Sequence, residues 1–266
     1  ADRPFSLLQF PRLNQLNIDG CTFTMVAKTK SPLNHSWILA NTTSVSVTPV
    51  QARGILTIRD AAVRGDASFV NVENFAPMGM ELTQCWVATP RTIFLFGGLP
   101  VDSSPSDIEL DIHQCTMIGG NGLVKSTGSE KRPYGHLIIQ ANRSILATVG
   151  DAALIQHYGQ VQWSSGEVPL YFDGDRNQFS AKKIWEIAND ARFLDRDYTL
   201  KQSIDQSTWF RQTNYTDRQA IMVDPYDGFA PLVDRVELPD WTAYPNTVAD
   251  PDAESDSIGA SAANIP

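Results

Sequence analysis

The sequence predicts an all-β fold: a single-stranded, right-handed parallel β-helix, in which short strands stack into a solenoid. Three observations favour this fold. Aliphatic runs of strand length, rich in Val, Ile, Leu and Thr, are separated by Gly, Asn, Asp and Pro. One short apolar pattern recurs along the chain, and each copy places a small residue at the same position.

The repeated pattern reads apolar, any, apolar, two polar or small residues, a small residue, any, apolar. Its copies begin at Leu16, Leu56, Met80, Leu110 and, in a weaker form, Leu137. The small position holds Cys21, Ala61, Cys85, Cys115 and Asn142. Equivalent residues of a parallel β-helix stack about 4.8 Å apart, so an inward bend needs a small side chain in every coil. A second apolar run follows most copies, which indicates two or more strands in each coil.

The spacing between copies fits one solenoid coil. From Ala61 onward the small positions lie about 24 to 30 residues apart, and we expect about five to seven coils. A leucine-rich repeat would need a fixed Leu-rich consensus, which the chain lacks. A β-sandwich would give alternating strands without placing a small residue at the same phase of each unit.

The carboxyl-terminal part is expected to cap the solenoid. Ser180–Ala191 has an N-cap residue and apolar positions at helical spacing, so it predicts an amphipathic helix. We divide the chain into a β-helix with its capping segment at 1–195, an irregular wrap at 196–244 and an acidic flexible tail at 245–266. An open solenoid end would expose unpaired strand edges, which is the reason to expect a cap of helix and loops.

The charge excludes one class of partner. The net charge is −9, and no cluster of Lys and Arg is dense enough to follow a phosphate backbone, so nucleic acid is not an expected partner.

No apolar run approaches the roughly 18 residues of a membrane span, so no membrane insertion is expected. Nothing near Ala1 resembles a signal peptide, and a start at Ala is compatible with a mature form or a piece of a longer chain.

The three cysteines lack the spacing of a zinc site. Their place in the repeat predicts buried free thiols. Cys85 and Cys115 are expected to be neighbours in an internal ladder, with parallel Cβ vectors that suit a disulfide poorly. Asn142 is expected in the same ladder, bonded to the backbone.

Several coils resemble a known group of proteins. The motifs at 19–23, 59–65, 84–87 and 111–117, and the aromatic segment from Val161 to Trp185, are similar to the C-terminal β-helix regions of planctomycete-type serine/threonine kinases and related surface proteins, within the pectin-lyase-like superfamily. The resemblance implies a non-catalytic interaction or sensory domain of a larger protein. No glycine-rich phosphate loop, HRD-like loop or DFG motif is present in the sequence.

The coil phasing aligns outward side chains in two columns. The first holds Asn17, Thr57, Glu81, Asp111 and Ile138, and the second holds Asp19, Arg59, Thr83, His113 and Gln140. Glu81 and Asp111 would then lie about one strand spacing apart, near enough to share a proton, to bind calcium or to act as an acid and base pair. The catalytic candidates are Glu81, Asp111, His113 and Arg59, and the metal candidates are Glu81, Glu109 and Asp111. A solvated strand face explains the same pattern.

We therefore expect a non-catalytic domain that binds a protein or a polysaccharide, with no cofactor other than calcium. The alternative is a polysaccharide lyase or glycoside hydrolase that acts on the outward face. Trp37, Trp86 and Trp163 are candidates to stack on sugar rings, although packing beneath a loop would explain Trp86 equally well. The side of the membrane is left open, with an extracytoplasmic or cell-surface setting favoured.

Overall fold

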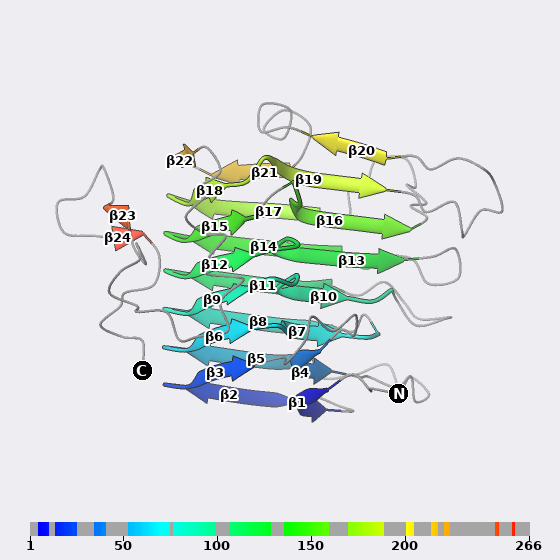
Figure 1. The fold of residues 1–266 in the computed structure, drawn as a ribbon, viewed down its shortest axis with the longest axis vertical. Coiled ribbons are helices and arrows are strands. Elements are labelled where there is room, and N and C mark those ends of the chain that lie inside the picture. Colours follow the sequence, from blue (N-terminus) through cyan, green and yellow to red (C-terminus); the bar gives the residue numbers. More distant parts are fainter. Residues whose placement is uncertain are drawn as a thin grey trace.

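The protein is a stack of short parallel strands arranged in three long sheets (Figure 1). The computed structural model describes residues 5–10, 14–25, 35–40, 53–74, 77–98, 107–128, 136–149, 151–159, 170–188, 201–204, 214–217, 221–223, 248–249 and 257–258. Each coil contributes one strand to each sheet in turn, and six coils have all three strands within these residues. This arrangement confirms the predicted parallel β-helix, while its handedness stays a prediction.

The sheets are named here A, B and C. Sheet A contains β1 (Ser6–Phe10), β4 (Ser36–Ala40), β7 (Ser68–Val72), β10 (Phe94–Phe96), β13 (Val124–Gly128), β16 (Ala153–Gly159), β19 (Lys183–Ala188) and β20 (Lys201–Ile204). Sheet B contains β2 (Gln15–Asp19), β5 (Gly54–Arg59), β8 (Met78–Thr83), β11 (Asp107–His113), β14 (His136–Asn142), β17 (Leu170–Asp175) and β21 (Asn214–Asp217). Sheet C contains β3 (Thr22–Met25), β6 (Ala62–Gly65), β9 (Trp86–Thr89), β12 (Thr116–Gly119), β15 (Ile145–Thr148), β18 (Gln178–Ser180) and β22 (Ile221–Val223). A separate pair is formed by β23 (Val248–Ala249) and β24 (Ser257–Ile258).

The core lies inside the coils. Along each strand of sheet B, buried aliphatic side chains alternate with outward ones, as in β11, where Ile108, Leu110 and Ile112 point inward. Equivalent residues pair between successive coils, so Leu56, Met80 and Leu110 stack in one row. The alternation of apolar and polar residues in the sequence produces these buried rows, because a strand turns successive side chains to opposite faces.

In the six coils whose connection is described, a sharp corner joins the strand of sheet B to the next strand of sheet C. The corner residue has a positive φ in all six described coils, namely Gly20, Asp60, Gln84, Gln114, Arg143 and Arg176. A single left-handed residue lets the chain turn from sheet B into sheet C within two positions, at a cost of about 1 kcal/mol or more for a side chain other than glycine. Stacking against the neighbouring coils holds each corner residue in this left-handed conformation.

The residue after each corner points into the core and forms a polar ladder. Cys85 N donates to Cys115 Sγ at 3.4 Å, Cys115 N donates to Ser144 Oγ at 3.0 Å, and Ser144 N donates to Asn177 Oδ1 at 2.9 Å. Cys85 and Cys115 are buried free thiols, as predicted, and Cys21 is half-buried. Burial raises the pKa of the Cys115 thiol, so it stays protonated and donates to the carbonyl of His113 at 3.3 Å.

The ladder position assigned to Asn142 is wrong by two residues. Asn142 pairs with His113 in sheet B, and Ser144 occupies the position equivalent to Cys115. The fifth copy of the repeat therefore starts at Ile139 rather than Leu137, and its small residue is a serine. Three consecutive aliphatic residues, Leu137 to Ile139, allowed both alignments in the sequence.

The helix predicted over Ser180–Ala191 is also wrong in the part that the structure describes. Lys183–Ala188 forms β19, which pairs in parallel with β16 and places Trp185 beside Ile155. The edge of β16 offers unpaired backbone groups, and satisfying them outweighs a helical spacing of apolar residues. The repeat thus continues through β17, β18 and β19, and β20 closes sheet A by pairing antiparallel with β19. Among the described residues, no helix has the length and apolarity required to cross a membrane.

Asn177 offers a direct test of the ladder. Its side chain accepts from Ser144 N and donates to Ala141 O at 2.5 Å, and it is fully buried. Asn177→Ala is expected to lower the free energy of unfolding by about 2 kcal/mol, because two buried backbone groups lose their partners. Urea unfolding measures this loss, with Asn17→Ala on an exposed outward position as the control. Equal stability of the two variants would contradict a stabilising ladder.

Candidate functional site

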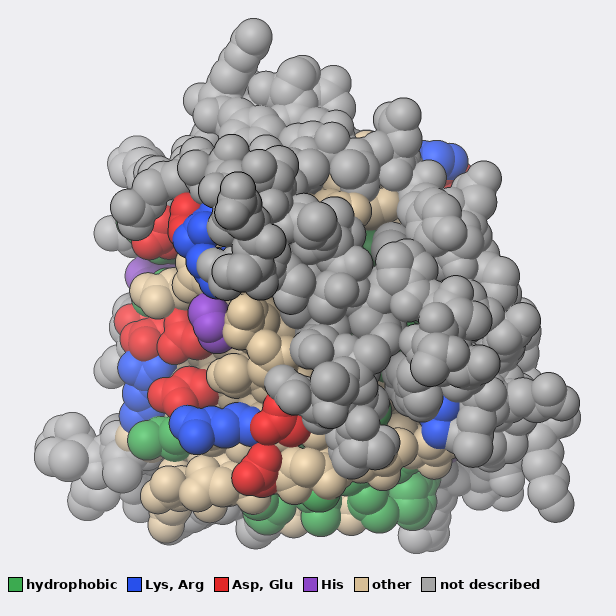
Figure 2. All heavy atoms as spheres, turned by 90° about the vertical axis from the view of Figure 1, so that its left-hand side faces the viewer, with side chains coloured by type: hydrophobic (Ala, Val, Ile, Leu, Met, Phe, Trp, Pro, Cys, Tyr) green, Lys and Arg blue, Asp and Glu red, His purple; other side chains and the backbone are tan. Residues whose placement is uncertain are grey.

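The outer face of sheet B carries the residues singled out by the sequence. Figure 2 views the molecule from the side where sheet B passes into sheet C and shows acidic and basic side chains alternating along the stack. Strand pairing sets the rows on this face. Glu81 pairs with Asp111 and Thr57, as predicted from the coil phasing, and Arg59 pairs with Thr83.

The structure brings Glu81 and Asp111 together. They are direct partners across β8 and β11, which places their α-carbons about one strand spacing apart. Burial raises the pKa of Asp111, and the negative charges of Glu109 and Glu81 raise it further, while Arg53 acts in the opposite direction. A carboxyl group with a raised pKa beside a second carboxylate is suited to donate a proton.

Glu109 is engaged in an ion pair rather than turned to a metal. Arg53 Nη2 donates to Glu109 Oε2 at 2.5 Å, and the guanidinium lies over Gly79. A Cβ at Gly79 would lie 2.8 Å from Arg53 Nη2, so the absence of a side chain there gives the arginine its path across β8. In the part of the chain that the structure describes, no three His, Cys, Asp or Glu side chains are arranged to hold a metal ion.

His113 and Arg59 lie in one row, separated by Thr83, so the structure places them two coils apart. Burial lowers the pKa of His113, and the nearby charge of Arg143 lowers it further, so the imidazole is neutral at pH 7. One end of β11 is occupied by a contact between His136 Nδ1 and Asp107 Oδ1 at 3.1 Å. The four catalytic candidates therefore share a face without converging on one point.

Two details of the predicted surface are corrected. The shifted fifth copy replaces Ile138 by Gln140 in the first outward column, and Gln140 by Asn142 in the second. Trp37 and Trp86 are 5% and 1% exposed, so neither presents a ring to a ligand, and the indole of Trp37 packs on Phe23 at 5.6 Å. Trp163 lies outside the described residues.

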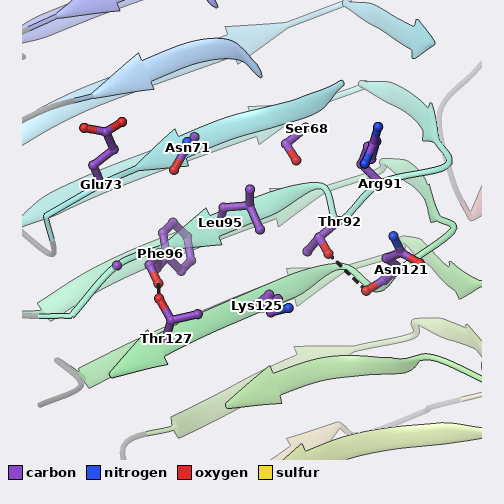
Figure 3. Close-up of a pocket in the computed structure, with 11 residues that line it drawn as sticks. Ser68, Asn71, Glu73, Arg91, Thr92, Leu95, Phe96, Asn121, Lys125 and Thr127 are labelled. Atoms are coloured by element: carbon purple, nitrogen blue, oxygen red, sulfur yellow. Dashed lines mark hydrogen bonds between the residues drawn. The ribbon is translucent and has the colours of Figure 1, made fainter. Parts of the chain in front are cut away.

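A groove lies on the outer face of sheet A and was not anticipated from the sequence (Figure 3). It has a volume of about 390 Å³ and crosses β7, β10 and β13. Asn71, Leu95 and Lys125 form its central row, because they are register partners in these three strands. Its remaining described lining residues are Ser68, Glu73, Arg91, Thr92, Phe96, Gly97, Asn121 and Thr127.

The polar groups of the groove are held in place by their neighbours. Arg91 Nε donates to Asp66 Oδ1 at 2.5 Å, and its Nη2 donates to Oδ2 at 3.3 Å. The carbonyl of Asn121 accepts from Thr92 Oγ1 at 3.0 Å and from Gln156 Nε2 at 2.7 Å. A binding surface fixed before the ligand arrives loses less conformational entropy on binding.

The sequence contained a weak signal for this groove. Asn71 stands between Val70 and Val72, and Lys125 follows Val124, so each polar residue interrupts one of the second apolar runs. Period-two alternation predicts that these side chains point outward. Whether these side chains lie near Glu73 and Arg91 depends on how the coils align. The sequence does not reveal this alignment, because the loops between strands vary in length.

Comparison with known proteins does not assign the chain to a family. No family model, curated protein or solved structure matches it. The fold and the two outward surfaces define it as a parallel β-solenoid with a preformed polar groove.

Proposed function

We propose that this chain is a non-catalytic interaction module of a larger protein and that the groove on sheet A binds an extended polysaccharide. The observation that carries the proposal is the groove itself. It combines amide and hydroxyl groups of Asn71, Asn121 and Thr127 with the apolar side chain of Leu95. Sugar rings present hydroxyl groups at their edges and C–H groups on their faces, so this mixture matches them.

The groove supports binding rather than bond cleavage. Of the 11 described residues that line it, one, Glu73, is a carboxylate, whereas glycoside hydrolysis uses a pair. Arg91 is bound to both oxygens of Asp66. We also propose, from the resemblance in the sequence, that the larger protein is a planctomycete-type kinase or a related surface protein.

Binding to a polysaccharide array, combined with a depolymerisation assay on every bound polysaccharide, tests the proposal. We expect binding without turnover. The double variant Asn71→Ala/Thr127→Ala is expected to weaken binding tenfold or more, because it removes side-chain hydrogen bonds worth about 0.5–1.5 kcal/mol each.

A matched double variant on the other face is the control. Glu81→Ala/Asp111→Ala alters the outer face of sheet B and is expected to leave binding unchanged. Binding that is lost in the sheet B variant and kept in the groove variant would contradict the location proposed for the ligand.

The second candidate function is a polysaccharide lyase or hydrolase on sheet B. It is favoured by the raised pKa of Asp111 beside Glu81, which suits a general acid next to a nucleophile or base. In that case the same assay, run with and without calcium, would show turnover, and the Glu81→Ala/Asp111→Ala variant would lose it. Absence of turnover in the wild type excludes this candidate for the polysaccharides on the array.

A further inference from the structure

The charged residues of the groove are balanced in sign. Three of its described lining residues are charged, namely Glu73, Arg91 and Lys125. Arg91 is bonded to Asp66 through two nitrogens, at 2.5 Å and 3.3 Å. The formal charges of these two cations and two carboxylates cancel, whereas the whole chain has a net charge of −9. The described part of the groove is therefore formally neutral on an acidic protein.

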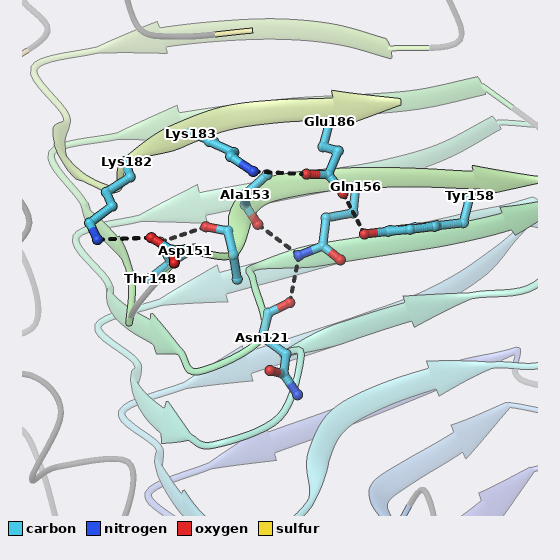
Figure 4. Close-up of polar contacts among 10 residues, drawn as sticks. Asn121, Thr148, Asp151, Ala153, Gln156, Tyr158, Lys182, Lys183 and Glu186 are labelled. Carbon is cyan, nitrogen blue, oxygen red and sulfur yellow. Dashed lines mark hydrogen bonds and ion pairs between the residues drawn. The ribbon is translucent and has the colours of Figure 1, made fainter. Parts of the chain in front are cut away.

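The charges on the neighbouring coils are also paired (Figure 4). Lys125 Nζ lies 4.6 Å from the centre of the Tyr158 ring on β16, whose face attracts a cation. Tyr158 Oη donates to Glu186 Oε1 at 2.5 Å, and Lys183 Nζ donates to Glu186 Oε2 at 3.4 Å. The ammonium of Lys125 is thus held against a ring that is itself bonded to a buried, ion-paired carboxylate.

Glu73 and Lys125 lie on either side of β10, as Figure 3 shows. Glu73 directly follows β7, and Lys125 lies in β13. Both side chains also interact with neighbouring residues of the protein. Their hydrogen-bonding capacities are opposite, because a carboxylate only accepts hydrogen bonds and an ammonium only donates them.

A glycan that lies across β10 meets both groups. A hydroxyl group donates and accepts, so an uncharged sugar can donate to Glu73 and accept from Lys125. A carboxylate or sulfate on the glycan would accept from Lys125 and be repelled by Glu73, and an ammonium would experience the reverse. The two residues together therefore favour uncharged groups and oppose either sign of charge.

We infer that the groove selects uncharged glycans and that Glu73 and Lys125 are its specificity-determining residues. Glu73 accepts a hydrogen bond from one hydroxyl group of the glycan, and Lys125 donates to another. The inference rests on the proposed function and adds the chemical class of the ligand.

The experiment compares three forms of one oligosaccharide, whose backbone is that of the polysaccharide bound best on the array. The first form is uncharged, the second carries a carboxylate at C6, and the third carries a protonated amino group at C2. Isothermal titration with the full chain is expected to show that the uncharged form binds at least about tenfold more tightly than either charged form. The affinity for the uncharged form is expected to stay the same as salt is raised.

Glu73→Gln removes the negative charge and keeps the length of the side chain. This variant is expected to bind the carboxylate form about tenfold more tightly than the wild type does, because the repulsion from Glu73 is gone. Its affinity for the uncharged form is expected to stay within about threefold, because the amide oxygen still accepts a hydrogen bond.

Lys125→Met removes the positive charge and gives the reciprocal result. The amino form is expected to bind about tenfold more tightly than to the wild type, because only the attraction to Glu73 remains. The uncharged form is expected to lose about two- to threefold in affinity with one hydrogen bond. Opposite gains in the two variants cannot arise from a folding defect, which would weaken the binding of every form.

Asp151 and Lys182 supply matched controls, because they pair with each other at 2.8 Å outside the groove. Asp151→Asn and Lys182→Met make the same changes of charge and are expected to leave the affinities for all three forms unchanged. An equal gain for the charged forms in these controls would assign the selectivity to overall charge and overturn the roles of Glu73 and Lys125.

The failures are distinguishable. Equal or tighter binding of a charged form by the wild type, weakened in Asn71→Ala/Thr127→Ala, overturns the selection of uncharged glycans and leaves the groove as a glycan site. A preference for the uncharged form without the gains in Glu73→Gln and Lys125→Met overturns the roles of these two residues. Absence of binding to every form overturns both proposals.

Discussion

Gly65→Ala is expected to destabilise the solenoid by about 4 kcal/mol or more, the largest effect that we predict. A Cβ on Gly65 would lie 2.0 Å from the carbonyl oxygen of Met25 on the neighbouring strand β3. The obstacle is backbone, and β3 is held by its pairing with β6, so the clash has no side chain that can move aside. The φ of +102° at Gly65 adds strain for any L-residue.

The control for this variant is Gly20→Ala. Gly20 also has a positive φ, of +60°, but a Cβ there would meet nothing within 4 Å. Its replacement is expected to cost about 1 kcal/mol, from backbone strain alone. Urea unfolding followed by tryptophan fluorescence measures both variants. If Gly65→Ala lost no more stability than Gly20→Ala, close packing between β3 and β6 would be contradicted.

Acidification is expected to remove about 3 kcal/mol of stability through one histidine. His157 on β16 is 1% exposed and points into the core, where its Nδ1 accepts from Trp185 Nε1 at 3.0 Å. Burial lowers the pKa of His157 to about 4 from its ordinary value of 6.5. The unfolded chain therefore binds more protons between these two values. Stability is unaffected above pH 6.5 and falls as the pH drops from 6.5 to about 4.

The variant His157→Gln tests this assignment, because its side-chain oxygen retains an acceptor for Trp185 without a titrating group. The free energy of unfolding, measured across pH 4 to 7, is expected to lose most of its slope in this variant. His136→Gln replaces a half-buried histidine on the outer face of sheet B and serves as the comparison. An unchanged slope in His157→Gln would assign the acid sensitivity to other groups.

The structural repeat could be identified from the sequence because it depends on local chemistry. Apolar alternation and the small residue after each corner recur at Cys21, Ala61, Cys85 and Cys115, and the strand pairing confirms their phase. The adjacency of Glu81 and Asp111 followed from the same phase. The prediction was wrong where local patterns were ambiguous: a run of three aliphatic residues shifted the fifth copy, and a helical spacing concealed β19.

The sequence by itself thus determined the coil, its inward residues and its outward rows, because a strand turns alternate side chains to opposite faces whatever lies beyond it. Tertiary structure alone decided how far the stack extends and what meets on sheet A. An unpaired edge at β16 recruits a segment with helical periodicity, since its backbone groups need partners. The groove needs Asn71, Leu95 and Lys125 from three coils in register, and the loops that set this register follow no repeat.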